Sequence, residues 1–204
     1  MTVVLPKERE RPSGGLVVVG ASLGGFDAVR ELLAGLRADF AWPLVLVQHR
    51  MSDPDGLLVE LLGAESPLSV SEPEDKDPIE RGNVYLAPSD YHLLIERGFF
   101  ALSTDAPVCH ARPSIDVLFE SAADSYGAST IAVVLTGSNR DGAEGARAVK
   151  KAGGKVLVQD PKTALSPVLP VAAIENTPVD GVLSIEAIAR RLTELSLDWP
   201  RERN

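Results

Sequence analysis

Three polar side chains, of the types that acyl transfer requires, each follow a separate apolar run of the chain. Ser22 lies in the glycine-rich turn GASLGG, and His49 directly follows the run LVLVQ. Asp141 comes a few residues after the run IAVVLT. In serine hydrolases a serine attacks, a histidine takes its proton, and an aspartate orients the histidine. The pattern therefore predicts a serine-type ester hydrolase with Ser22 as its nucleophile.

The turn that holds Ser22 has more than one meaning when it is taken alone. Its sequence fits the G-x-S-x-G pattern of a nucleophile on a sharp strand-to-helix turn. It also resembles the glycine-rich nucleotide loop of short-chain dehydrogenases, in which helix N-terminal amides hold phosphate. A serine that only caps the next helix is a third reading. The turn by itself leaves all three open.

The histidine and the aspartate also have structural alternatives. His49 could be a partly buried histidine that bonds to backbone, but it is the only histidine predicted to end a core strand, since His92 lies inside a strand and His110 precedes a helix. Asp141 could cap the following helix, and this role is compatible with orienting His49. The order Ser, His, Asp differs from that of α/β-hydrolases, so the pattern indicates another lineage of triad.

The elements that would position these residues alternate between strands and helices. LVVVG (16–20) is predicted to be a buried strand, FDAVRELLAGLRADF (26–40) a helix, and LVLVQ (44–48) a second buried strand. This order predicts a parallel sheet with a right-handed crossover, in which the carboxyl ends of the strands share one edge. The fold class is α/β, with a doubly wound, mostly parallel, Rossmann-like sheet and helices on both faces.

The rest of the chain continues this alternation after a different middle part. NVYLAP (83–88), HLLIE (92–96) and FFALS (99–103) predict a small antiparallel hairpin excursion. Ser114 is a natural N-cap for the next helix. The later predicted elements are the strand IAVVLT, a helix near 142–152, the strand 155–160, a strand-like segment at 179–184 and the helix 185–195.

The organisation is that of one domain between short polar ends. Residues 1–14 are expected to form a flexible leader, 15–197 the catalytic domain and 198–204 a polar tail. The 204 residues are 45% hydrophobic, enough for a sizeable core. A formal net charge of -9 argues against a nucleic-acid surface. The single Cys109 excludes an internal disulfide, and the absence of a signal segment or a long apolar run predicts a cytoplasmic protein without membrane insertion.

Several ordered sequence blocks resemble the catalytic domain of CheB-type protein-glutamate methylesterases. They are VVVGASLGG, VLVQH, VYLAP, ARPSIDVLF, VVLTGSNRDGAEG, AGGKVLVQD and PVAAIE, and they span roughly residues 16 to 190. The resemblance implies that Ser22 is the nucleophile, His49 the base and Asp141 the residue that orients it. It also implies that the backbone N–H groups near Leu23 and Ser138 form the oxyanion hole.

The resemblance further implies the substrate and the partners. The expected reaction is hydrolysis of glutamate methyl esters on chemoreceptor-like proteins, which releases methanol, often beside glutamine deamidation. No metal and no organic cofactor are expected. The leader is too short for a receiver domain, so the resemblance is to the catalytic domain alone. Control by phosphorylation within the same chain is not expected, and a separate response regulator or sensor kinase is one candidate partner.

The chain departs from the family pattern at positions around the site. Leu23 stands where threonine is usual, and Ser138-Asn139 where Met-Gly is usual. Arg50 replaces a methionine after the Gln-His pair, and SPVLP replaces a GMP-like segment. Side-chain changes at Leu23 and Ser138 leave the backbone N–H groups in place, so the reaction type is better supported than the choice of substrate.

Two other functions compete with the esterase. An NAD(P)-dependent short-chain dehydrogenase would need a Tyr-x-x-x-Lys pair, but none of the three tyrosines is followed four positions later by a lysine. A non-catalytic module with the same fold could instead bind a receptor or a signalling helix. Methanol release and reaction of Ser22 with a fluorophosphonate probe would separate this module from an enzyme.

Overall fold

The computed structural model describes residues 14–50 and 56–198, so residues 1–13 of the predicted leader (1–14) and residues 199–204 of the predicted tail (198–204) lie outside the described residues. The strands are β1 (Leu16–Ala21), β2 (Leu44–Gln48), β3 (Ser69–Ser71), β4 (Asn83–Leu86), β5 (His92–Glu96), β6 (Phe99–Ser103), β7 (Thr130–Val134), β8 (Lys155–Gln159) and β9 (Gly181–Leu183). The helices are α1 (Gly25–Ala34), α2 (Leu57–Glu65), α3 (Ile115–Tyr126), α4 (Ala143–Lys151), α5 (Val168–Asn176) and α6 (Ile185–Asp198).

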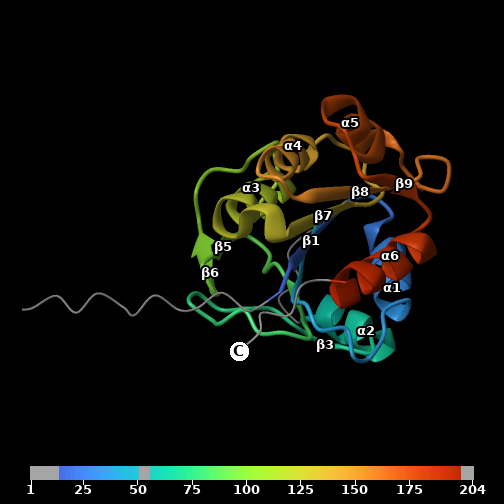
Figure 1. Cartoon of the computed structure of the whole chain (residues 1–204). Coiled ribbons are helices and arrows are strands. Elements are labelled where there is room, and N and C mark those ends of the chain that lie inside the picture. The colour runs from blue at the N-terminus through green and yellow to red at the C-terminus, as the bar shows by residue number, and fades with distance from the viewer. Residues whose placement is uncertain (1–13, 51–55, 199–204) are drawn as a thin grey trace, which may run out of the picture.

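Seven strands form one sheet in the order β3-β4-β2-β1-β7-β8-β9, and every neighbouring pair in it is parallel. The strands β5 and β6 form a separate antiparallel pair. Figure 1 shows the helices packed on both sides of the large sheet. The predicted α/β class, with a parallel sheet and a small antiparallel excursion, is confirmed. Parallel sheets are covered on both faces, and for this reason the central strands are continuous apolar runs.

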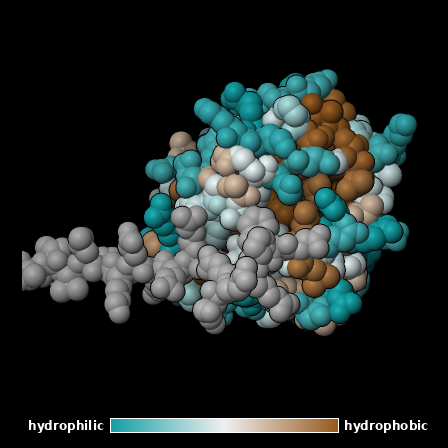
Figure 2. Space-filling model, in the orientation of Figure 1, coloured by the Kyte–Doolittle hydropathy of each residue, from teal (hydrophilic) through white to brown (hydrophobic). Residues whose placement is uncertain are grey.

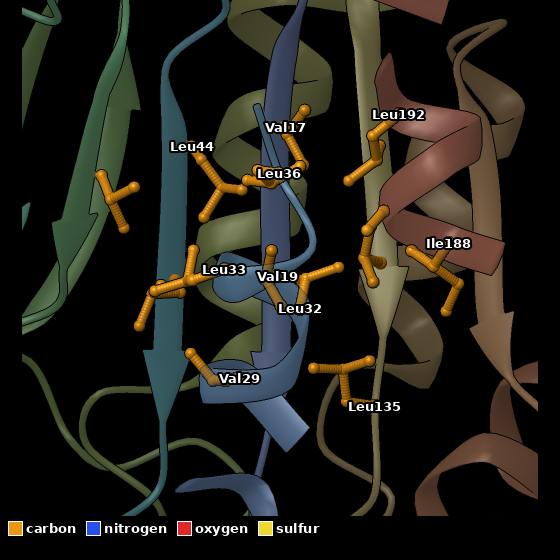
Figure 3. Packing of buried hydrophobic residues seen from close by; sticks show 14 of the residues in the cluster. Val17, Val19, Val29, Leu32, Leu33, Leu36, Leu44, Leu135, Ile188 and Leu192 are labelled. Atoms are coloured by element: carbon orange, nitrogen blue, oxygen red, sulfur yellow. The ribbon is translucent and has the colours of Figure 1, made fainter. Parts of the chain in front are cut away.

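Successive residues of the central strand β1 point into two different apolar layers. Val17 and Val19 belong to the apolar layer that includes residues of α1 and α6, and Figure 3 shows Leu32 and Ile188 in the same layer. Leu16 and Val18 belong to the opposite layer, which is formed with α3, α4 and α5. This alternation follows from the two-residue period of a strand. The same packing fixes the end of β1, and with it the position of Ser22.

The middle of the chain differs from the sequence-based prediction. The segment 83–88 was expected to belong to the hairpin excursion, but its residues 83–86 form β4 and pair in parallel with β2 in the large sheet. This expectation was wrong because a short apolar run does not reveal its pairing partner. The hairpin consists of β5 and β6 alone, at the predicted positions 92–96 and 99–103.

Other elements differ in existence or length. The segments α2, β3 and α5 had no sequence-based prediction. The helix expected at 26–40 ends at Ala34, and Gly35 follows as its C-cap. A side chain at Gly35 would come within 2.9 Å of Ala189 Cβ, so this glycine allows α6 to pack closely against α1. Within the described ranges, no helix combines the length and the apolar character needed to cross a membrane.

Candidate active site

Ser22 and His49 leave two neighbouring strands at the same level. Ala21, the last residue of β1, pairs with Gln48, the last residue of β2, in a parallel register. Ser22 directly follows β1, and His49 directly follows β2. The His49 backbone N–H donates to Ala21 O at 3.0 Å. The Gln48 side-chain amide donates to Ser22 O at 2.9 Å and to His49 O at 3.0 Å. One buried amide therefore ties the two predicted catalytic residues together.

The loop after β7 approaches Ser22 from the other side, because β7 is the second neighbour of β1. The Ser22 backbone N–H donates to Thr136 O at 3.0 Å. A Cβ atom at Gly137 would lie 3.0 Å from Ser22 Cβ and 2.9 Å from Leu169 Cδ2. Only glycine fits here without a shift of its neighbours. The strand order β2-β1-β7 thus brings all three predicted site segments to one edge of the sheet.

His49 and Asp141 are in direct contact at this edge. His49 Nε2 lies 2.8 Å from Asp141 Oδ2, and the Asp141 side chain is fully buried. The first turn of α3 also donates to this carboxylate: Ser114 Oγ at 2.7 Å, Ile115 N–H at 2.7 Å and Asp116 N–H at 3.1 Å. A carboxylate with four donors is held in one orientation. It can therefore fix the ring of His49.

The alternative that Asp141 caps the helix after it is wrong. The residue does not cap the following helix, because the N-cap of α4 is Gly142 and no side chain caps it there. Asp141 binds the first turn of α3 instead. Asp116 of α3 accepts hydrogen bonds from Gly142 N–H at 2.8 Å and Gly145 N–H at 2.7 Å. A carboxylate from α3 therefore binds the backbone N–H groups at the start of α4.

The two carboxyl groups have pKa values shifted in opposite directions. Burial by itself raises the pKa of Asp141, but hydrogen bonds from His49, Ile115 N–H and Ser114 outweigh it and leave the pKa below its ordinary value. Burial and the nearby Asp141 charge raise the pKa of Asp116 to about 6, against the opposing hydrogen bonds from backbone N–H groups. Asp141 is thus the member of the pair that carries the charge facing His49.

The Ser22 hydroxyl stands apart from this hydrogen-bonded pair. It makes no hydrogen bond to any residue that the structure describes. The second ring nitrogen of His49, Nδ1, lies 3.2 Å from Asn139 Nδ2. The backbones of Ser22 and His49 therefore lie side by side, but their side chains form no hydrogen bond with each other in this structure.

The two backbone groups predicted to stabilise an oxyanion are available. In the described part of the chain, neither Leu23 N–H nor Ser138 N–H donates to another protein group. The Thr136 hydroxyl holds the turn in place, since it donates to Leu23 O at 2.9 Å and accepts from Ser166 N–H at 2.9 Å. These two free donors flank Ser22 through the turn after β1 and the loop after β7.

One group of side chains has the composition of a possible metal site. Ligand atoms of Cys109, Asp116 and Asp141 lie within 4.8 Å of one another. However, both oxygens of Asp141 and Oδ1 of Asp116 already accept two hydrogen bonds each. Burial, together with the two carboxylate charges, raises the pKa of the Cys109 thiol. The group fits a hydrogen-bonded network better than a cation.

Sequence reasoning missed several residues that support the site. Ser114 was recognised only as an N-cap, which it is through Val117 N–H, but its hydroxyl also binds Asp141. Gln48 and Thr136 lie in the VLVQH and VVLTGSNRDGAEG blocks, but the sequence did not predict their hydrogen bonds, because both resemble ordinary polar residues at the end of a strand. His92 lies in β5 as predicted, and its Nδ1 accepts the Ser114 N–H at 3.3 Å. Arg50, a departure from the family pattern, forms an ion pair with Glu72.

The fold and site together define a Rossmann-like α/β protein with a Ser, a His and an Asp at the carboxyl edge of three adjacent central strands. The chain belongs to the CheB methylesterase family, whose model matches residues 17–192. This membership supersedes the dehydrogenase interpretation of the GASLGG turn.

Individual relatives agree with the family model. A protein of Leptospira interrogans is 44% identical over 180 residues, which cover 88% of this chain and 93% of that protein. The "Protein-glutamate methylesterase/protein-glutamine glutaminase 2" of Anaeromyxobacter dehalogenans is 44% identical over 181 residues, 89% of this chain but 53% of that protein. The Leptospira relative carries the same two activities in its name. The chain thus spans about half the length of some relatives.

A solved structure has the same fold. The crystal structure of the Thermotoga maritima CheB methylesterase catalytic domain matches with a TM-score of 0.87 and 36% sequence identity. The match covers 90% of this chain and 100% of that chain. At this identity and coverage, the arrangement of strands around the site is shared along with the overall architecture.

Proposed function

We propose that the protein is a protein-glutamate methylesterase that removes methyl groups from glutamate methyl esters of a chemoreceptor-like protein, and that it also deamidates glutamine. The observation that carries the proposal is the 2.8 Å contact between His49 Nε2 and the buried Asp141 at the strand edge where Ser22 lies. The names of the relatives provide the substrate class.

The contacts of His49 assign its two nitrogens different tasks. Nε2 faces Asp141, so it carries the hydrogen that the carboxylate accepts. Nδ1 is then the nitrogen that receives the Ser22 proton when the Ser22 oxygen attacks the ester carbonyl. The negative charge of Asp141 stabilises the imidazolium formed in this step. The backbone N–H groups of Leu23 and Ser138 stabilise the developing oxyanion.

The second half of the reaction reverses these proton transfers. The imidazolium of His49 gives its proton to the leaving methoxide, and methanol departs from a glutamyl ester of Ser22. His49 then takes a proton from water as the water oxygen attacks this ester, and the imidazolium returns the proton to the Ser22 oxygen as glutamate is released. With glutamine as substrate, the leaving group is ammonia and the same intermediate forms.

Apolar side chains beside Ser22 suit a protein substrate. The side chains of Leu23, Leu165, Val168 and Val171 are exposed, and the first two are more than half exposed, at 55% and 73%. A Cβ atom at Gly24 would lie 2.7 Å from Leu165 Cβ, so the turn after β1 contacts the segment before α5. Figure 2 shows a hydrophobic area where α5 and β9 lie. Such an area fits the apolar face of a receptor helix.

The cellular setting rests on the sequence and on the family. A role in chemotaxis-like signalling, a separate response regulator or sensor kinase as partner, and a cytoplasmic location stay predictions.

Methanol release from a methylated receptor fragment tests the proposed reaction. Ser22→Ala removes the nucleophile and should abolish methanol release while the urea unfolding midpoint stays unchanged. Ser69→Ala removes an exposed hydroxyl from the edge strand β3 and should keep full activity. Turnover that persists in Ser22→Ala, or no turnover in the folded wild type, would contradict the proposal. The second outcome would favour a binding module.

A further inference from the structure

The amide of Asn139 has a defined orientation beside His49. Asn139 Oδ1 accepts the Asp141 backbone N–H at 3.3 Å, so this end of the amide must be the oxygen. The nitrogen end then faces His49 Nδ1, at 3.2 Å. An amide nitrogen can only donate, and Nδ1 must therefore accept. The two contacts of one side chain agree on a single assignment.

The same assignment follows from the other nitrogen of the ring. His49 Nε2 faces the Asp141 carboxylate, which only accepts, so the hydrogen of the neutral imidazole is on Nε2. Nδ1 is then the unprotonated nitrogen, and it is the atom that a general base needs free. In this structure its lone pair is occupied by the Asn139 amide.

The Ser22 hydroxyl would need the same lone pair. Its backbone is fixed next to His49 by the Gln48 amide and next to the loop after β7 by Thr136 O. Its hydroxyl nevertheless has no hydrogen-bond partner within the described ranges. Asn139 and Ser22 are thus alternative donors to one acceptor, and the structure holds the form in which Asn139 occupies it.

We propose that Asn139 is a positioning residue that gates the general base: its side chain occupies His49 Nδ1 at rest and must rotate away before Ser22 can transfer its proton. This inference rests on the proposed function, because it assumes that Ser22 reacts through His49. The Asn139 side chain is half-buried in the loop between β7 and α4, so its rotation requires no change in the sheet. Glycine at this position would leave Nδ1 open.

The reaction of Ser22 with a small fluorophosphonate tests the gate without a receptor. Asn139→Ala removes the competing donor, and the labelling rate should rise about fivefold, the factor that corresponds to one ordinary hydrogen bond. Asn139→Asp replaces the donor by an acceptor that holds a proton on Nδ1, and it should label more slowly than the wild type. Arg140→Ala, an exposed change in the same loop, should label at the wild-type rate.

A spectroscopic measurement covers the case in which a variant fails to fold. The ¹⁵N spectrum of the His49 ring in the wild type should show a protonated Nε2 and an accepting Nδ1, and Asn139→Ala should shift the Nδ1 resonance. A protonated Nδ1 in the neutral wild type would overturn the gate. So would labelling of Asn139→Ala that is no faster than that of the wild type. If methanol release is normal in that case, only the gate fails, whereas absent labelling and absent methanol release in both forms reject the proposed function as well.

Discussion

The carboxylates of Asp116 and Asp141 connect the first turns of α3 and α4 to each other. Asp141, just before α4, accepts from the start of α3, and Asp116, in α3, accepts from Gly142 and Gly145 at the start of α4. Helix N-terminal amides attract carboxylates, so the exchange joins the two helices at the site. It also places two carboxyl groups close together in the interior, and the burial of Asp116, together with the repulsion from Asp141, has a measurable consequence.

The consequence is a pH-dependent stability that Asp116→Asn should remove. The pKa of Asp116 in the folded protein is about 6, above the ordinary value of 3.8 in an unfolded chain. The folded state therefore binds this proton more tightly, and the contribution of Asp116 to stability is full below pH 3.8 and lost as the pH rises through 6. The lowered pKa of Asp141 acts in the opposite sense, but only as the pH falls below 3.8.

Urea unfolding between pH 4.5 and 7.5 measures this effect. The difference in unfolding free energy between the wild type and Asp116→Asn should change by roughly 2 kcal/mol over this range, and it should favour the variant at the higher pH. An asparagine oxygen still accepts from Gly142 and Gly145, so the helix contact is kept. Asp124→Asn, on the exposed side of the same helix, is the matched control. A difference that does not vary with pH would contradict the assigned burial of the Asp116 charge.

Ser114→Ala should affect both stability and activity. The change removes the N-cap of α3 and one of the four donors to Asp141. We expect a loss of about 1–2 kcal/mol of unfolding free energy and a fall in methanol release of roughly tenfold. Ser184→Ala removes the hydroxyl that binds Ala187 N–H at the start of α6 and should reduce stability without changing activity. Equal activity in the two variants would show that Ser114 only caps its helix.

The candidate site residues could be selected from the sequence, but the hydrogen bonds between them could not. Buried apolar runs locate parallel strands, and the carboxyl ends of such strands share an edge, so Ser22, His49 and Asp141 could be selected before their contacts were known. Pairing partners in a sheet are not encoded locally, which is why the run at 83–88 was assigned to the hairpin. Asn139 was noted only as a departure from the family pattern, because its proposed role depends on which of the two His49 nitrogens faces Asp141, and only side-chain coordinates give this.

Gly137→Ala should reduce activity more than stability. The added Cβ atom would lie 3.0 Å from Ser22 Cβ and 2.9 Å from Leu169 Cδ2, so it would push the nucleophile and α5 apart. A displacement of about 1 Å at a reacting group can cost roughly a hundredfold in rate. Methanol release and fluorophosphonate labelling should both fall.

A glycine in an open position is the control for this change. A Cβ atom at Gly63, inside α2, would meet only Val70 Cβ, at 3.9 Å. Gly63→Ala should therefore stabilise the protein by about 0.5–1 kcal/mol and leave the reaction of Ser22 unchanged. Wild-type labelling in Gly137→Ala would mean that the loop after β7 can move without disturbing Ser22.

Leu165→Ser should weaken the use of a receptor substrate but not the chemistry. Leu165 is 73% exposed and lies against the turn that carries Leu23, so it belongs to the surface beside Ser22. Loss of a buried leucine contact in the complex is worth about 1.5–3 kcal/mol, and KM for the methylated receptor fragment should rise by at least tenfold. Labelling of Ser22 by the small probe should stay at the wild-type rate. Leu197→Ser, at a 66% exposed position near the end of α6, should change neither quantity. If KM stays constant in Leu165→Ser while the probe reacts normally, the receptor binds elsewhere, and the apolar area around α5 is not part of its contact surface.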